Sequence, residues 1–521
     1  MSFGGGVVLE KMKGLGDLFG QKVDHPLANP KELKLAIDAL PKDNAFKALD
    51  EIAGWLESLQ MVSEFPLARL YEAARQLEDA SVFSLRRLAR EYLLTPRLNK
   101  PDERRLWAIN HGFWTLLASV YERCTVDASA DGKAAEALKP QLPALYSRLL
   151  AAYGGIQKWE QFRYGPPPSS LWGRIGRALQ RAEAEGIAGK VVSLGAGTGV
   201  TSPVQEFQRL VVFQAASMHG LLPFEIEIAE KLIAHFLPNF VFTATAMHDS
   251  VYWVDLQLAQ VPQRLARMPA QASPSQRFFR PGPAHEQISA LLDTLARGGE
   301  VPSDLNLGAQ YQAKVLIPVL QHLSAYLAPI PPQRKHDRHR VKHRVSVLNG
   351  LVNAFVAFSG EFGGRPAGLQ MESWVVENVS RGGFGALVPN LPADWLKVGA
   401  LLALQPEGGE NWLLGIVRRY QRTLENEARV GIEALARQVV SIEAYVRSAS
   451  SYAAVAGIPA LLALDAQSDG EILVVLPPAT FDLRESLEFT RDGRRQGLSP
   501  VALVEHTSDF ELARYRLSPL G

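Results

Sequence analysis

Two arginines four residues apart, Arg340 and Arg344, are the residues of this sequence best suited to bind a charged ligand. They lie in the basic run 334–344, which leads into a Val345-Ser346-Val347 strand pattern. A guanidinium group stays charged at any physiological pH and can donate two parallel hydrogen bonds to phosphate oxygens. The spacing therefore indicates a site for a nucleotide that carries several phosphates.

A second polar segment, Asn378-Val379-Ser380-Arg381-Gly382-Gly383, follows after enough residues for two strands and a turn. Asn378 offers a carbonyl acceptor and an amide donor, and Ser380 adds a hydroxyl, so both can hydrogen-bond a base. Gly383 allows the backbone to turn, or to approach a ligand closely, where a Cβ atom would clash. We therefore expect the arginines to bind phosphates and this segment to read the base.

Together the two segments resemble the PilZ domain, a small β-barrel family that binds the bacterial second messenger cyclic di-GMP. The family carries R-x-x-x-R before its first strand and D/N-x-S-x-x-G in the strand pair that follows, and both occur here in that order. Strand patterns at 396–404, 412–419 and 429–433 are similar to the later strands of PilZ domains. The resemblance covers about residues 334–447.

The resemblance implies a role for each part of the two motifs. The arginines of the first motif would hold phosphates or stack on guanine, and two arginines in the flexible lead-in would fold over a ligand dimer. The polar side chains of the second motif would hydrogen-bond the guanine edge, and its glycines would admit the ligand. The expected ligand-binding residues are Arg334, Arg338, Arg340, Arg344, Asn378, Ser380, Gly382 and Gly383.

The same resemblance implies a cytoplasmic effector that changes its domain arrangement when cyclic di-GMP binds. Proteins with this domain generally act in motility, surface attachment or exopolysaccharide production. A helical module would present its surface to a protein partner, which the sequence does not identify. Cyclic di-GMP is the expected ligand, and we expect no metal, no catalytic residue and no membrane insertion.

A competing motif is the Gly-rich segment 195–199, which resembles the first motif of S-adenosylmethionine-dependent methyltransferases. Ser193 stands where those enzymes usually carry an acidic residue, Pro203 interrupts the helix that should follow, and no β-α-β series comes after it. The alternative interpretation is a turn between helices, with Thr201 or Ser202 capping the next helix. This second interpretation is favoured.

The basic run has two further interpretations. It could bind nucleic acid through phosphate contacts alone, although the Asn378 segment would then have no purpose. His336, His339 and His343 would lie on one side of a helix as metal ligands, but the surrounding cations oppose a metal ion. The sequence also contains no G-x-S-x-G, H-E-x-x-H or P-loop motif, so a receptor is favoured over an enzyme.

Composition and charge narrow the class of protein further. The 521 residues include 55 Lys and Arg against 54 Asp and Glu, which gives a net charge of +1. The net charge of the protein therefore does not attract nucleic acid or an anionic membrane. The single cysteine, Cys124, excludes an intrachain disulfide and is expected to be a buried thiol in a helix. The N-terminus is a poor signal peptide and no long apolar run occurs, so we expect a soluble cytoplasmic protein.

The expected fold class is multidomain α+β, with a mostly α-helical N-terminal region. Apolar residues recur at three- and four-residue steps at 45–59 and 67–77, which predicts helices. Phe240–Thr245 and Val251–Leu256 are expected to pair as a hairpin. The expected units are a flexible leader (1–27), an α-helical module (28–327, one unit or two divided near 165–170), a Pro-rich linker (328–333), a PilZ-like six-stranded β-barrel (334–447) and a small β-unit (448–521).

Overall fold

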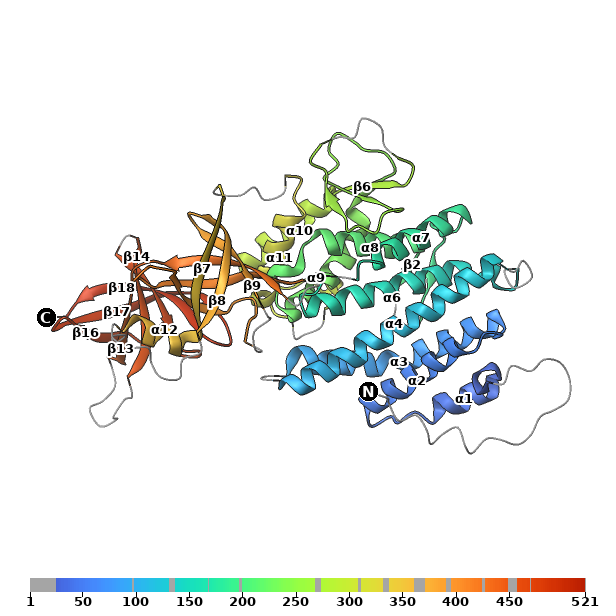
Figure 1. Ribbon diagram of the computed structural model, residues 1–521, viewed down its shortest axis with the longest axis horizontal. Coiled ribbons are helices and arrows are strands. Elements are labelled where there is room, and N and C mark those ends of the chain that lie inside the picture. The colour runs from blue at the N-terminus through green and yellow to red at the C-terminus, as the bar shows by residue number, and fades with distance from the viewer. Residues whose placement is uncertain are drawn as a thin grey trace. The chain divides into compact units, whose positions relative to one another are not determined.

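The computed structural model describes residues 25–95, 98–130, 136–166, 168–195, 199–267, 273–307, 311–330, 337–359, 371–389, 395–423, 427–447, 457–468 and 470–520. The chain divides into two compact units. Unit 1 comprises residues 1–163, 167–218 and 222–332, and unit 2 comprises residues 164–166, 219–221 and 333–521. Unit 1 is mainly helical and unit 2 mainly β-structure (Figure 1), which confirms the expected α+β class.

Unit 1 is built from helices joined by short connections. Its α-helices include α1 (Pro30–Asp38), α2 (Ala45–Met61), α3 (Leu67–Leu94), α4 (Lys100–Ala130), α6 (Leu142–Phe162), α7 (Leu171–Ala184), α8 (Pro203–Ala215), α9 (Pro223–Phe236), α10 (Pro283–Ala296) and α11 (Ala313–Tyr326). Its 3-10 helices include η1 (Pro26–Ala28), η2 (Lys139–Gln141), η4 (Leu237–Asn239) and η5 (Ser303–Leu305), while η3 (Met218–Gly220) lies where the two units meet in sequence.

Several helix starts in unit 1 follow capping chemistry. Asn29, Asn44 and Ser202 are N-caps whose side chains accept a hydrogen bond from a backbone N–H in the first turn of α1, α2 and α8. Of the two residues expected to cap the helix after the Gly-rich segment, Thr201 or Ser202, it is Ser202 that does so. Pro203 begins α8 instead of interrupting it, because the first helical position needs no N–H donor.

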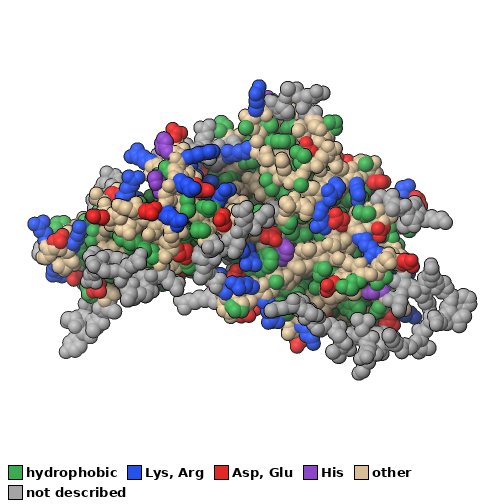
Figure 2. Space-filling model, viewed as in Figure 1, with side chains coloured by type: hydrophobic (Ala, Val, Ile, Leu, Met, Phe, Trp, Pro, Cys, Tyr) green, Lys and Arg blue, Asp and Glu red, His purple; other side chains and the backbone are tan. Residues whose placement is uncertain are grey.

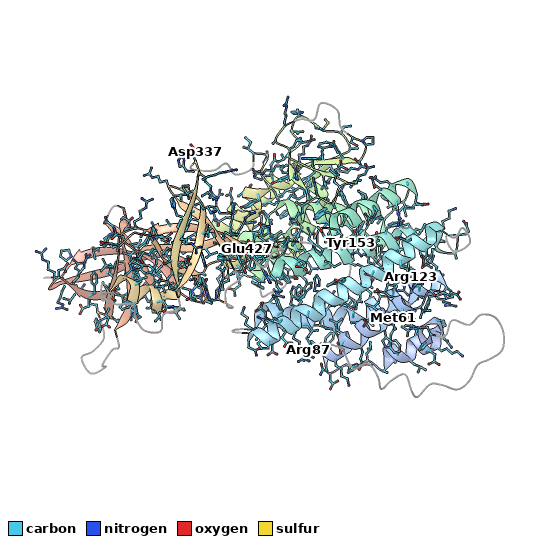
Figure 3. All side chains as sticks on the ribbon, in the orientation of Figure 1. Met61, Arg87, Arg123, Tyr153, Asp337 and Glu427 are labelled. Carbon is cyan, nitrogen blue, oxygen red and sulfur yellow. The ribbon has the colours of Figure 1, made fainter. Side chains whose placement is uncertain are left out.

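Helix α6 lies in the middle of unit 1 and is buried on most of its surface, as expected for a helix that is apolar nearly all round. It packs against α4, α7, α8 and α9. Trp159 and Tyr153 are among its largest buried side chains, and Figure 3 labels Tyr153. The buried thiol of Cys124 on α4 confirms the expectation for that residue.

A small sheet in unit 1 has the strand order β3-β6-β4-β5, formed by β3 (Val241–Thr243), β4 (Tyr252–Asp255), β5 (Gln263–Arg264) and β6 (Gln276–Arg280). The expected hairpin between the segments of β3 and β4 is wrong, because β6 lies between them and pairs with both. The rings of Phe242 and Tyr252 both stack on Phe279 of β6, at centroid distances of 5.1 and 4.9 Å. Burial of aromatic rings thus selects the distant strand as the central one.

The Gly-rich segment joins two very short strands, β1 (Val192–Ser193) and β2 (Val200–Thr201), which pair antiparallel. The methyltransferase motif instead requires a parallel strand within a β-α-β series. In the described part of unit 1, every strand pair that the sheets contain is antiparallel. Residues 196–198 lie outside the described residues, and β1 and β2 stand between α7 and α8 in the chain.

The first closed barrel of unit 2 has six strands, which confirms the expected strand number. They are β7 (His339–Asn349), β8 (Glu372–Ser380), β9 (Gly383–Val388), β10 (Leu401–Pro406), β11 (Leu413–Arg422) and β12 (Ala428–Ala436). Their order is β10-β11-β12-β9-β8-β7, and antiparallel pairing of β7 with β10 closes the barrel. Helix α12 (Gly350–Phe358) follows β7 directly.

The second closed barrel contains β13 (Val439–Val446), β14 (Ile458–Ser468), β15 (Glu471–Leu476), β16 (Leu487–Arg491), β17 (Arg494–His506) and β18 (Glu511–Pro519). Its order is β13-β14-β15-β18-β17-β16. The range 334–447 expected for the first barrel takes in β13, which pairs with β14 and β16 and so belongs to the second. The C-terminal β-unit therefore has its own closed sheet and does not complete the preceding one.

The two barrels share an apolar cluster. Leu401 and Leu414 of the first barrel meet Leu461 and Phe510 of the second, with α12 packed beside them. Among the described residues, none of the buried members of this cluster comes from β8 or β9.

Glu511 is a buried carboxylate that ties the start of β18 to residues 479–481. It accepts hydrogen bonds from the backbone N–H groups of Ala479, Thr480 and Phe481 and contacts the ring of His506 at 3.0 Å. Burial acts to raise the pKa of Glu511, but these hydrogen bonds outweigh it, so the pKa lies below its usual value of 4.5. Its stabilising effect is thus present above pH 4.5 and lost as the pH falls through the lower folded-state pKa.

We expect Glu511→Gln to weaken the second barrel by about 1.5–3 kcal/mol at neutral pH, the usual contribution of hydrogen bonds to a charged group. Amide exchange at residues 479–481 should accelerate at pH 7, and the acceleration should be smaller at a pH below 4.5. Glu488→Gln, which removes an exposed ion pair with Arg495, is the matched control and should change little. An equal effect of Glu511→Gln at both pH values would contradict the prediction.

Candidate functional site

The basic run forms part of strand β7 and does not merely precede it. β7 begins at His339, so Arg340 and Arg344 lie within the strand, which corrects the expectation that R-x-x-x-R stands before it. The physical reason is that β8 is long enough to pair with these positions, Arg340 opposite Asn378 and Arg344 opposite Val375. Arg334 lies outside the described residues.

The arginines of β7 share the outer face of the barrel. Val345 and Val347 are buried in the barrel core, whereas Arg340, Lys342 and Arg344 are exposed. Successive side chains of a strand point to opposite faces, so even-numbered positions of this segment point outward. The R-x-x-x-R spacing therefore puts both guanidinium groups on one surface.

A β-bulge turns Asn378 to the same outer face. Val376 pairs with Ala386 in the barrel interior, and Asn378 pairs with the very next residue of β9, Gly385, so β8 carries one extra residue at Glu377. Strict alternation from Val376 would have pointed Asn378 into the barrel. The bulge reverses that direction, as bulges commonly do beside binding sites.

Arg338, Arg340 and Asn378 come together at this point. The Arg338 guanidinium donates from Nη1 to Asn378 Oδ1 at 3.0 Å, and Arg340 lies opposite Asn378 in the strand register. Arg344 is on the same face one step along β7, where its Nη1 donates to Ser373 Oγ at 3.4 Å. The structure thus brings the first motif beside the asparagine of the second.

The hairpin turn after β8 holds the rest of the second motif. Ser380 pairs with Gly383, and its hydroxyl donates to the Gly383 carbonyl at 3.0 Å, while the Gly382 carbonyl accepts from Ala434 N at 3.1 Å. Gly383 has a φ of +152°, and a Cβ there would overlap Ile432 O on β12. Close approach of two strands therefore gives Gly383 a packing role in addition to the ligand role expected for it.

A cavity of about 720 Å³ lies on this outer face, between the start of β7 and the bulged part of β8. Three cationic side chains line it, Arg338, Arg340 and Lys342, against the single carboxylate of Glu377. Figure 2 shows Lys, Arg and His side chains gathered over this end of β7, and Figure 3 labels Asp337, which precedes the strand. The excess of positive charge suits a ligand with more than one phosphate.

The strand register extends the site with residues that sequence reasoning missed. Arg340 pairs with Asn378, and Asn378 pairs with Gly385 on β9. Gly385 in turn pairs with Gly431 on β12, and Gly431 pairs with the exposed Arg419 on β11, so the five residues form one row across the barrel. A Cβ on Gly385 would lie 2.7 Å from Asn378 Nδ2, so the glycine makes room for the asparagine side chain. The row has an arginine at either end, and the Asn378 side chain lies against the buried Gly385 between them. Gly431 and Arg419 lie in predicted strands and Gly385 does not, and the alignment of the three depends on register.

The described histidines of the basic run lie on a strand and not on a helix, which corrects that interpretation. His339 and His343 belong to β7, and His336 lies outside the described residues. Among the residues that the structure describes, no group of three or more His, Cys, Asp or Glu is arranged to hold a metal ion. Nor is any described helix both long and apolar enough to cross a membrane.

Comparison with known families identifies the other end of the chain. Residues 31–246 match the family model described as "Cyclic-di-GMP receptor FimW, N-terminal domain". The match begins in α1, ends just after β3 and lies almost entirely in unit 1, the helical region that the PilZ resemblance left unexplained. A search of curated proteins finds no match.

Residues 31–246 are thus similar to the N-terminal domain of a cyclic di-GMP receptor family, and a receptor has a binding role. Two separate parts of the sequence thus indicate the same ligand. The helical region does so by its similarity to the family model, and the first barrel by the resemblance of its two motifs to those of PilZ domains. The family model does not extend to the barrel, so the assignment of the binding residues rests on their geometry.

Proposed function

We propose that this protein is a cytoplasmic effector of bacterial cyclic di-GMP signalling, and that its first barrel is a PilZ domain that binds the nucleotide on the outer face of β7, β8 and β9. The observation that carries this proposal is the meeting of Arg338, Arg340 and Asn378 around one cationic cavity. The match of residues 31–246 to a cyclic di-GMP receptor family supports the same ligand independently.

The chemistry of the face suggests how the ligand is held. Arg340 and Arg344 bind phosphate oxygens or stack on guanine, and Asn378 hydrogen-bonds the guanine edge. Arg338 leaves Asn378 Oδ1 to bind a second ligand molecule or its phosphate, which frees that oxygen to accept from the base. Ser380, Gly382 and Gly383 shape the turn beside the base, and Arg334 belongs to the same set as a further cation.

The test is calorimetric titration of the full-length protein with cyclic di-GMP, with GTP and S-adenosylmethionine as controls. We expect saturable binding of cyclic di-GMP, no binding of S-adenosylmethionine and weak or no binding of GTP. Saturable binding of S-adenosylmethionine, lost in Gly197→Ala, would favour the methyltransferase interpretation instead. Binding of a DNA or RNA oligonucleotide with no effect of cyclic di-GMP would favour the nucleic-acid interpretation.

The proposed mechanism is a change in domain arrangement. Pro329, Pro331 and Pro332 stiffen the segment that precedes β7, so ordering of the arginines by a ligand also fixes the direction of the chain that leaves the barrel. A ligand shifts such an equilibrium only by binding one arrangement more tightly than the other. The helical unit would then present a different surface to a protein partner that controls motility, attachment or exopolysaccharide production.

Cyclic di-GMP should therefore slow amide exchange and protease cleavage across residues 328–344, and small-angle scattering of the full-length protein should change on saturation. Replacing Pro329, Pro331 and Pro332 together by Gly should leave affinity nearly intact while reducing the change in scattering, because a flexible linker transmits orientation poorly. Identical scattering with and without saturating ligand would rule out this mechanism and leave presentation of a new barrel surface as the alternative.

A further inference from the structure

Unit 1 contains a cavity of about 590 Å³ that shares no residue with the barrel site. Helix α3 lines it from Val82 to Leu94, and residues of α4, α6 and α9 complete most of the lining. An α-helix rises 1.5 Å per residue, so this stretch of α3 is about 18 Å long, or more than three turns. The cavity is therefore an elongated groove, which we call the α3 groove.

The α3 side of the groove is apolar and reaches solvent. Val82 and Leu94 are 37% and 39% exposed, and Leu85, Ala89 and Leu93 between them are partly buried. Positions three and four residues apart share a helix face, so residues 82, 85, 89 and 93 form one continuous stripe. An apolar stripe on a helix normally faces the core of a protein. This one lines a groove, so part of its surface stays in contact with water.

Aromatic side chains and a face of α9 form the rest of the groove that a ligand can reach. Trp114 of α4 and Phe224 of α9 are both partly exposed. The Trp114 ring lies against Gly155 of α6, where a Cβ would overlap it. Phe224, Glu227 and Lys231 stand at three- and four-residue steps, so they share a face of α9. Grooves of this kind, apolar and bordered by helices, bind the apolar face of an amphipathic helix.

Arg86 and Arg90 give the groove an excess of positive charge. They stand four residues apart on α3, both are exposed, and neither forms an ion pair within the part of the chain that the structure describes. Lys158, by contrast, lies 3.0 Å from Glu227 and 2.7 Å from Glu230, so its charge is balanced within the protein. Two guanidinium groups therefore remain at the groove, and each can bind a carboxylate with two parallel hydrogen bonds.

We infer that the α3 groove binds an acidic amphipathic helix of a partner protein, with the apolar face of that helix on the stripe and Trp114, and its carboxylates on Arg86 and Arg90. Complementary charge of this kind sets the specificity and the orientation of binding. The inference rests on the proposed function only in taking the ligand to be the protein partner of the helical unit. The groove itself needs no nucleotide in the barrel.

Other occupants fit the groove less well. Residues 1–24 contain three Lys against three Asp and Glu, so the side chains of this segment carry no net negative charge. Attraction of a basic helix to an anionic membrane usually takes a cluster of about four to eight Lys or Arg, whereas α3 presents Arg86, Arg87 and Arg90 here. A flat lipid surface would also leave the apolar stripe inside the groove uncovered. Charge and shape together therefore favour the acidic helix.

The probe is a set of fluorescently labelled peptides of about 16 residues, long enough to form a helix. They carry Leu, Phe or Met at three- and four-residue steps on one face and Glu elsewhere. Comparison peptides carry Lys in place of Glu, or the same residues in scrambled order. Fluorescence anisotropy with the full-length protein, without cyclic di-GMP, should show saturable binding of at least one Glu peptide, at least tenfold tighter than that of its comparison peptides.

Failure of every Glu peptide to bind, or equal binding of the Lys peptides, would overturn the inference. Because no nucleotide is present, this result does not depend on the barrel site. A failure of the barrel to bind cyclic di-GMP would therefore be seen separately, in the calorimetric titration.

Three substitutions on α3 locate the site. Arg86→Glu and Arg90→Glu should each lower peptide affinity about tenfold, because a carboxylate would then face the carboxylates of the peptide. Ala89→Phe fills the groove without a change of charge and should lower affinity to a similar extent. Thermal unfolding checks that each variant stays folded.

Arg87→Glu is the matched control. It makes the same change of charge on the same helix, but Arg87 lines a different cavity, so peptide affinity should change by less than about threefold (Figure 3). Equal affinities of the Arg86→Glu, Arg90→Glu and Arg87→Glu variants would show that the peptide does not bind in the groove.

The remaining measurements test the other occupants. Vesicles of equal parts phosphatidylcholine and phosphatidylglycerol should not bind, removal of residues 1–24 should leave peptide affinity unchanged, and Arg86→Glu should leave the oligomeric state in sedimentation unchanged. Vesicle binding that is lost in Arg86→Glu would assign the groove to a membrane. A tenfold rise in affinity without residues 1–24 would assign it to that segment, and self-association lost in Arg86→Glu would assign it to a second copy of the chain. Each of these outcomes would overturn the inference.

Discussion

Replacing Arg340 and Arg344 together by Ala is expected to lower the affinity of the full-length protein for cyclic di-GMP by about 10²–10⁴-fold. Each guanidinium group would lose hydrogen bonds to a charged partner that contribute roughly 1.5–3 kcal/mol, and 1.4 kcal/mol corresponds to about a factor of ten. Both side chains are exposed on the outer face of β7, so the barrel core should not be disturbed. Calorimetry at two salt concentrations measures the effect and its electrostatic share.

The matched control for the arginines lies in the second barrel. Arg516 is an exposed strand arginine, 3.7 Å from Glu471, and Arg516→Ala should leave affinity unchanged. Arg419→Ala tests the row that the strand register reveals and should reduce affinity by less than the double substitution in β7. If Arg340→Ala and Arg344→Ala both bind as the unsubstituted protein does, with intact folding, the outer face of β7 is not the ligand site.

Gly385→Val is expected to reduce cyclic di-GMP affinity by about 10²-fold while the barrel stays folded. Its Cβ would lie 2.7 Å from Nδ2 and 3.0 Å from Oδ1 of Asn378, so the asparagine must leave its place beside Arg338. The added methyl groups would also cover the surface between Asn378 and Gly431. Valine is well suited to a strand, so stability should change by no more than about 1 kcal/mol.

Gly497→Val provides the comparison for the glycine substitution. Gly497 is also a buried strand glycine, and its Cβ would meet side-chain atoms, Ser518 Oγ at 3.2 Å and Leu520 Cδ2 at 3.3 Å. This substitution in the second barrel should leave ligand affinity as it is. Thermal unfolding of both variants separates a lost site from a lost fold, and full affinity in a folded Gly385→Val would show that Asn378 does not read the ligand.

Local sequence was sufficient for the features that depend on neighbouring residues. The helices of unit 1 follow from the three- and four-residue spacing of apolar side chains, and Ser202 caps α8 because a hydroxyl there can reach the first turn. The strands of the first barrel follow from aliphatic runs between Gly and polar turns.

Pairing between distant segments could not be obtained in this way. β6 lies between β3 and β4 because the ring of Phe279 stacks on aromatic rings of both neighbouring strands. The second barrel closes because β13, which was expected in the first barrel, pairs with β16 of the second. Strand pairing depends on which side chains the whole fold buries, and the apolar pattern of one strand does not specify the strand that pairs with it.

The sequence by itself predicted a nucleotide with several phosphates, because the chemistry of arginine and asparagine in two spaced motifs does not depend on the rest of the chain, and the resemblance to PilZ domains implied cyclic di-GMP. Only the tertiary structure decided which further residues join the two motifs. A one-residue bulge at Glu377 turns Asn378 outward, and the register then aligns Gly385, Gly431 and Arg419 with it. A shift of a single residue reverses the face of every side chain that follows, so this alignment exists only once the barrel has closed.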